Sequence, residues 1–123
     1  MSVADPFRRL VYCSLTEWLF IFEMEKLFSY GTLRNHEVQI ELFGRDVPSR
    51  RDTLDGYGIQ PIEIGGETHK LAVVDEDSSI KGRVLELSKE ELAVCDFYEP
   101  APYERIEVTL ASGETAWAYV AAN

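Results

Sequence analysis

Short extended segments joined by tight turns dominate the chain after residue 23. They have the alternation or the β-branched and aromatic content of strands, and they span residues 26–29, 54–64, 70–74, 80–87, 103–110 and 115–121. Gly65-Gly66 and residues 111–114 are hairpin signals. About six or seven strands in so short a chain would expose too much edge as a flat sheet. We therefore predict an α+β fold, a small mixed, mainly antiparallel β-barrel with one or two peripheral helices.

The middle of the chain contains one helical segment and two interruptions of the strand pattern. Residues 35–43 predict a helix, with Val38, Leu42 and Phe43 facing inward, that stops at Gly44. The acidic segment Asp75–Ser79 predicts a solvated turn between two strands. Gly82 indicates a bulge or a point where another backbone approaches closely.

A second helix is predicted by a capping box that begins at Ser88. The Ser88 hydroxyl accepts a hydrogen bond from the Glu91 amide, and the Glu91 carboxylate accepts one from the Ser88 amide. This helix should run to about Phe97, because Pro100 and Pro102 prevent its continuation.

The balance of charge argues against one class of function. The 123 residues, enough for one domain, contain 12 Lys and Arg against 22 Asp and Glu, a net charge of −10. Such a field repels phosphate backbones, so we expect no nucleic-acid partner. An anionic substrate would need local backbone dipoles or an arginine. Arg45, Arg50 and Arg51 form the one local basic concentration, which we interpret as a solvated loop.

Cysteine and histidine do not indicate a disulfide framework or a metal centre. Cys13 and Cys95 are too few for such a framework, which favours the reduced cytoplasm. Cys95 has apolar helical spacing from Leu92 and is predicted to be a buried, inert thiol. His36 and His69 lack metal-ligand spacing. We expect no metal and no cofactor.

Residues 1–23 differ from the rest of the chain, with Arg8-Arg9 before an apolar, aromatic run that Glu17 interrupts. The run is too short and charged for a membrane span, and no small-residue cleavage site follows it. We interpret it as an N-terminal extension, either upstream of a true start at Met24 or packed on the surface of a domain that spans residues 24–123. A further alternative is that residues 10–22 dock on a membrane or a partner.

The sequence Tyr30-Gly31-Thr32-Leu33 follows the first strand and forms a candidate anion-binding turn. Gly31 permits positive φ and close backbone approach, so that successive amides can point at one oxygen. The structural alternative is a strand-to-helix turn in which Thr32 caps the helix that follows.

Glu99 is the candidate general acid or base. It lies at a helix exit, where the macrodipole disfavours a carboxylate, and Tyr98 and Pro100 rather than basic residues flank it. Both effects raise a carboxyl pKa towards the range useful for proton transfer. The alternative is an exposed loop glutamate. Asp96 is interpreted as a solvated or capping residue.

Taken in order, five segments of the chain resemble the gamma-glutamylcyclotransferase-like family, including its gamma-glutamylamine cyclotransferase-type members. The resemblance covers roughly residues 26–121, and its segments are Phe28–Leu33, Lys81–Leu87, Leu92–Glu99, Tyr103–Val108 and Trp117–Val120. It implies a small mixed barrel whose pocket pairs the Tyr30–Leu33 loop with one essential acid, Glu99. The implied reaction releases 5-oxoproline and a free amine or amino acid from a gamma-glutamyl amide, with Glu99 as general acid and base.

Three further residues are candidates for substrate binding, each with a structural alternative. Tyr103 and Tyr119 either contact substrate or pack in the barrel with the hydroxyl at its rim. Arg105 either contacts substrate or is an exposed strand residue paired with Glu107.

One departure from the family pattern bears on activity. Members commonly have glycine after the essential acid, where this chain has Pro100, which should hold Glu99 extended. The rival interpretation is therefore a noncatalytic module that keeps the pocket to bind a small metabolite. The leaving amine stays open, and we expect a monomer or weak homodimer.

Overall fold

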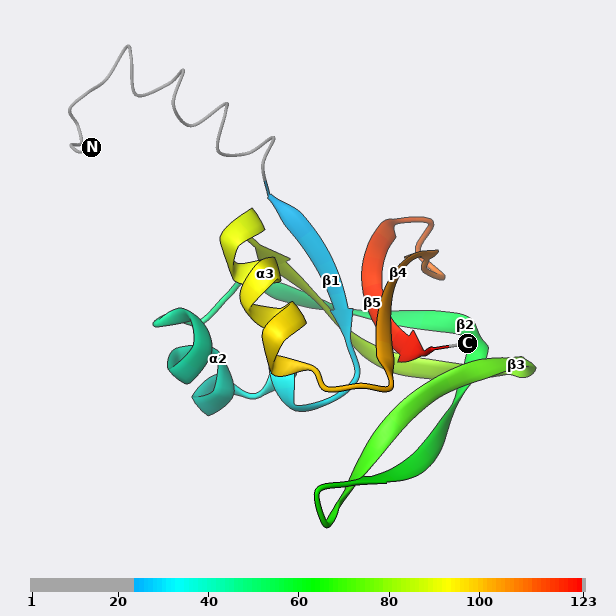
Figure 1. The fold of residues 1–123 in the computed structure, drawn as a ribbon. Helices are drawn as coiled ribbons and strands as arrows, with labels where there is room; N and C mark the ends of the chain where they lie inside the picture. Colours follow the sequence, from blue (N-terminus) through cyan, green and yellow to red (C-terminus); the bar gives the residue numbers. More distant parts are fainter. Residues whose placement is uncertain (1–23, 123) are drawn as a thin grey trace, which may run out of the picture.

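The computed structural model describes residues 24–122, so the predicted N-terminal extension, with Cys13, lies outside the described residues (Figure 1). The elements in chain order are β1 (Glu25–Ser29), η1 (Thr32–Arg34), α2 (His36–Phe43), β2 (Ser49–Ile64), β3 (Glu67–Leu87), α3 (Lys89–Tyr98), β4 (Tyr103–Thr109) and β5 (Thr115–Ala121).

The five strands form one curled sheet in the order β2-β3-β1-β5-β4. Neighbouring strands are antiparallel except for β1 and β5, which are parallel with Leu27 opposite Trp117. Figure 1 shows both helices on one side of β1, while the tip of the β2–β3 hairpin extends away from the body of the fold. The predicted fold class is therefore confirmed, as a half-barrel with two helices.

The sheet contains five strands rather than six or seven, because two of them, β2 and β3, are long. The predicted turn at Asp75–Ser79 is wrong, since β3 continues through it as a single strand of 21 residues. The pairing of β2 with β3 shifts register between Asp55 and Tyr57, and the Asp75 carboxylate accepts hydrogen bonds from the Asp77 amide at 3.1 Å and the Ser78 hydroxyl at 2.8 Å. Residues 75–78 have no partner on β2, because the register passes from Ser79 opposite Asp55 to Val74 opposite Tyr57, and they form an exposed bulge within the strand.

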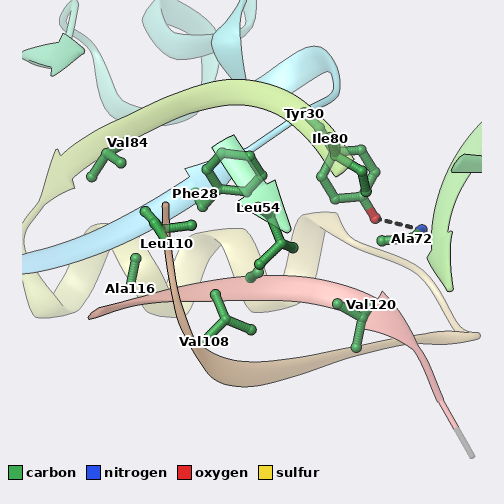
Figure 2. Close-up of a cluster of buried hydrophobic side chains, with 11 residues drawn as sticks. Phe28, Tyr30, Leu54, Ala72, Ile80, Val84, Val108, Leu110, Ala116 and Val120 are labelled. Atoms are coloured by element: carbon green, nitrogen blue, oxygen red, sulfur yellow. Dashed lines mark hydrogen bonds between the residues drawn. The ribbon is translucent and has the colours of Figure 1, made fainter. Parts of the chain in front are cut away.

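Buried side chains form two clusters, one on each face of the central strand β1. Phe28 belongs to the cluster inside the curled sheet, which also takes side chains from the other four strands (Figure 2). Leu27 belongs to the cluster beneath the helices, with Leu92 and Cys95 of α3. Because consecutive strand residues face opposite sides, β1 joins both parts of the core.

The close approach predicted at Gly82 is present between β3 and β1. A Cβ atom at this position would lie 2.4 Å from the Ser29 carbonyl oxygen and 2.8 Å from the Phe28 ring. Only glycine allows the two backbones to pack this tightly. The contact fixes the end of β1, from which the Tyr30 turn begins.

Both helices begin and end as predicted, with small shifts. The Asn35 side chain caps α2 by accepting a hydrogen bond from the Glu37 amide, and Gly44 ends the helix at φ 74°. The capping box of α3 is complete, with both the Ser88 and the Glu91 bonds formed. This helix ends at Tyr98, which leaves Glu99 as its C-cap.

Candidate active site

The Tyr30 turn follows the end of β1. Because β1 and β5 are parallel and Tyr103 pairs with Ala121, the end of β5 and the beginning of β4 lie at this same end of the sheet. The buried Tyr30 hydroxyl donates to the Tyr119 carbonyl at 2.6 Å and accepts from the Ala72 amide at 3.0 Å. Figure 2 shows the second of these bonds. Burial raises the pKa of this phenol. Tyr30 therefore joins three strands and holds the turn in place.

The turn after Tyr30 contains two backbone amides that are available to an external acceptor. Thr32 and Leu33 begin η1, where amides have no acceptor within the helix, and no hydrogen bond among residues 24–122 engages either amide. Three carbonyls of the turn accept hydrogen bonds: Gly31 from the Arg34 amide and side chain, Thr32 from the Asn35 amide, and Leu33 from the buried Gln39 amide group at 2.9 Å. The Thr32 and Leu33 amides are thus left as donors beside carbonyls that already have partners.

Two details of the turn differ from expectation. Gly31 has φ −128°, outside the left-handed region, and a Cβ atom there would meet no atom within 4 Å, so neither the positive φ nor the close backbone approach predicted at this glycine is present. The Thr32 hydroxyl hydrogen-bonds the Tyr98 hydroxyl at 2.8 Å, and Asn35 caps α2 instead. Thr32 thereby ties the turn to the last residue of α3.

Glu99 follows α3 in an extended conformation, with φ −83° and ψ 119°, as its position before Pro100 predicts. Its amide donates to the Cys95 carbonyl. Burial of the carboxyl raises its pKa to about 7, and no hydrogen bond or ion pair to the side chain occurs within the described part of the chain. Desolvation therefore makes this carboxyl able to both accept and donate a proton near neutrality.

A cavity of about 660 Å³ brings most of the predicted residues together. Glu99, the Tyr30–Leu33 turn, Tyr103 and Tyr119 all line it. The remaining lining residues are Phe28, Ser29, Arg34, Asn35, Thr68, His69, Lys70, Tyr98 and Pro100. Sequence reasoning missed Thr68, His69 and Lys70, because only the folded β2–β3 hairpin brings them beside Glu99.

The two predicted tyrosines have different environments. Tyr103 is half-buried, and its hydroxyl donates to the Lys70 carbonyl at 2.5 Å. Burial, and secondly the charge of Glu99, raise the pKa of this phenol. Tyr119 is buried, and its hydroxyl donates to the Asp96 carboxylate at 2.6 Å. Both hydroxyls therefore have partners within the protein.

Arg105 is not among the residues that line this cavity. Its Nε and a terminal nitrogen donate to the two Asp96 carboxylate oxygens at 2.8 and 3.0 Å, and its guanidinium lies 4.4 Å from the centre of the Trp117 ring. Asp96, rather than Glu107, is thus its partner, and Asp96 is not simply solvated. Two nitrogens of Arg105 therefore donate to Asp96 away from the residues that line the cavity, and contact between Arg105 and substrate stays a prediction.

Cys95 is fully buried, and burial raises its thiol pKa to about 12, which confirms the predicted inert core cysteine. Within residues 24–122, no helix is long and apolar enough to cross a membrane. The same residues contain no group of three or more His, Cys, Asp and Glu side chains arranged to hold a metal ion.

Comparisons with known proteins agree with this architecture. A solution structure from Arabidopsis thaliana has a TM-score of 0.70 at 23% identity and covers 82% of this chain and 70% of its own. An uncharacterised human protein has a TM-score of 0.70 at 18% identity, covering 82% and 68%. A structure described as gamma-glutamyl cyclotransferase has a TM-score of 0.68 at 16% identity, with the same coverage of 82% and 68%. At these identities the likeness establishes the fold alone.

The sequence itself was compared with curated proteins and with family models. No curated protein matches it. The family described as gamma-glutamyl cyclotransferase, AIG2-like, matches residues 27–123. The chain therefore belongs to the gamma-glutamyl cyclotransferase, AIG2-like family.

Proposed function

We propose that this protein is a gamma-glutamyl cyclotransferase, which converts a gamma-glutamyl amide into 5-oxoproline and a free amine or amino acid. The principal support is Glu99, whose desolvated carboxyl has a pKa of about 7 and lines the same cavity as the amide turn. Family membership supports the general reaction class. Substrate and residue roles are part of the proposal.

The reaction needs a folded substrate and one group that moves protons. The Glu99 carboxylate takes a proton from the substrate's α-ammonium group, and the resulting amine attacks the gamma-carbonyl carbon of the same molecule. A five-membered lactam forms as the bond from this carbon to the leaving nitrogen breaks. Glu99 gives this proton to the leaving nitrogen and takes the second proton of the attacking nitrogen, which becomes the lactam N–H. The second proton passes to the released amine, which departs as an ammonium, so Glu99 ends the cycle as the carboxylate it began as. No enzyme nucleophile is required.

The Tyr30 turn supplies binding and electrostatic stabilisation in this proposal. The free amides of Thr32 and Leu33 donate to the substrate carboxylate or to the oxygen that becomes negative during attack. The positively charged residues that line the cavity, Arg34 and Lys70, offset the protein's net charge of −10 near an anionic substrate.

The test is direct measurement of 5-oxoproline from a panel of gamma-glutamyl amino acids and gamma-glutamyl amines. We expect at least one compound to be converted, with release of one amine per 5-oxoproline. No product from any member of the panel, with folded protein shown by circular dichroism, would reject the proposal. Calorimetric binding without conversion would indicate the noncatalytic module instead, in which Pro100 beside Glu99 changes access to the acid.

A further inference from the structure

A network of polar side chains lies behind the wall of the cavity, on the α3 side of β4 and β5. Its centre is Asp96, on the last turn of α3. One carboxylate oxygen accepts from Arg105 Nε at 2.8 Å and from the Tyr119 hydroxyl at 2.6 Å, and the other accepts from Arg105 at 3.0 Å. A single carboxylate thus links α3 to β4 and β5.

Trp117 packs against the Arg105 side chain of this network and is itself held by a hydrogen bond. Arg105 packs against the Trp117 ring, and the Trp117 indole donates to the Glu25 carboxylate at 3.0 Å. A bidentate pair backed by an aromatic ring restricts the guanidinium more than a surface ion pair does. The arrangement therefore fixes a distance between the end of α3 and the start of β4.

The segment between Asp96 and Arg105 contains Glu99. The chain leaves α3 at Glu99, turns through Pro100 and re-enters the sheet at Tyr103, and all three residues line the cavity. The ion pair closes this segment into a loop, and the Tyr103 amide donates to the Pro100 carbonyl within it at 3.1 Å. Glu99 thus lies in a short loop whose two ends, at Asp96 and Arg105, are held together by the ion pair.

We propose that Asp96 and Arg105 are positioning residues that hold the Glu99 side chain in its partly buried place in the cavity. The inference rests on the proposed function for its catalytic consequence, and on geometry alone for its structural one. If the pair is lost, the loop gains freedom, water reaches the Glu99 carboxyl, and the acid no longer keeps a fixed geometry with substrate.

A second ion pair on the same helix provides a matched control. Arg45 donates two hydrogen bonds to Glu91 at 2.8 Å each, which ties the first turn of α3 to the residues after α2. This pair is also bidentate and partly buried, but neither residue lines the cavity of Glu99. It stabilises the same helix without closing the loop around the acid.

The experiment compares two charge-neutral double variants, Asp96→Asn with Arg105→Gln and Glu91→Gln with Arg45→Gln. Each removes one positive and one negative charge, so the net charge is unchanged, and glutamine at position 91 can still complete the capping box. Two quantities are measured for each variant and the wild type: kcat and KM on a converted gamma-glutamyl compound, and the Glu99 carboxyl pKa by NMR titration.

Several groups surround Glu99 and are unchanged in both variants. The titratable and charged residues on the elements packed around it are Tyr30, Arg34, His69, Lys70, Cys95, Tyr98, Tyr103 and Tyr119. None of them is altered, and burial rather than the charges of Asp96 and Arg105 is the cause of the raised Glu99 pKa, so a change in this pKa reports hydration of the carboxyl.

For the Asp96/Arg105 variant we expect kcat to fall about tenfold or more with a smaller change in KM. We also expect the Glu99 pKa to move from about 7 towards its ordinary value of 4.5. The Glu91/Arg45 variant should keep kcat within about twofold of the wild-type value and the Glu99 pKa within about 0.3 pH units of it. This should hold even if the variant melts at a lower temperature.

Equal effects of the two variants on kcat and on the Glu99 pKa would overturn the inference, as would an unchanged pKa in the Asp96/Arg105 variant. If that variant does not fold, the single variant Arg105→Lys, which keeps the charge but cannot form both bonds, replaces it with the same criteria. The NMR titration needs no turnover, so failure of the proposed function and failure of this inference are distinguishable.

Discussion

Asp96 and Glu99 are two acidic residues one turn apart at the end of the same helix, and folding shifts the pKa values of their carboxyl groups in opposite directions. Hydrogen bonds from Arg105, with a further bond from Tyr119, lower the pKa of Asp96. Burial without a partner raises the pKa of Glu99 to about 7. The difference teaches that helix position does not set these values, because what decides them is whether the folded chain supplies donors or only removes water.

The largest difference between the two acids should be in turnover. We expect Glu99→Gln to lower kcat by about 10³-fold, since glutamine can neither take nor return the proton. Asp96→Asn should lower it only about tenfold, because its role is positional. The measurement is the rate of 5-oxoproline formation, with circular dichroism to show folding. Activity of Glu99→Gln within tenfold of the wild type would remove the acid from the mechanism.

The pH dependence of kcat/KM should report Glu99 and not Asp96. The base must be ionised, so activity should fall about tenfold per pH unit as pH drops below about 7. The lowered pKa of Asp96 keeps that group charged throughout the same range. A pH–rate profile from pH 3.5 to 9 checks this. An acid limb near pH 4.5 instead would mean that the carboxyl is hydrated in solution.

Stability should show a smaller effect, and here the two acids differ in sign. Because folding raises the Glu99 pKa, the contribution of this group is fully present below its unfolded value near 4.5 and is lost as pH rises through about 7. We expect Glu99→Gln to raise the free energy of unfolding by about 2 kcal/mol at pH 8, and by little at pH 4.5. Urea denaturation at both pH values measures the difference.

Asp96→Asn provides the opposite case in the same measurement. Its pKa is lowered by folding, so its contribution is present above its unfolded value and is lost as pH falls through the folded one. Since the side chain is 40% exposed, solvent screening limits the loss to about 1 kcal/mol at pH 7. A gain in stability for Asp96→Asn at pH 7, or a loss for Glu99→Gln at pH 8, would break the comparison.

Local features of the fold were predictable because their causes lie within a few residues. The Ser88 capping box, the stop at Gly44 and the hairpin at Gly65-Gly66 depend on neighbouring backbone groups, and all three are present. The segment Asp75–Ser79 was not predictable in this way. A solvated turn and an exposed bulge within a strand favour the same acidic residues, and only the pairing of both flanks, Val74 and Ser79, with β2 decides between them.

The candidate site was predictable in part for the same reason. The position of Glu99 before Pro100 and after a helix is local, and so is the Tyr30 turn. Arg105 shows the limit. It shares a face of β4 with Tyr103, but it lies about 6.6 Å further along the strand, where Asp96 rather than the cavity receives its side chain. Strand alternation predicts which face of the sheet the Arg105 side chain lies on, but not which residue it contacts there.

The sequence by itself determined the family, the helix boundaries and the two segments that meet at the cavity, since these depend on short motifs and their order. Tertiary structure alone decided which carboxyl is paired and which is desolvated, and it brought Lys70 and its neighbours beside Glu99. The physical reason is that desolvation and ion pairing depend on distances through space. The parallel pairing of β1 with β5 and the long β2–β3 hairpin set those distances for residues far apart in the chain.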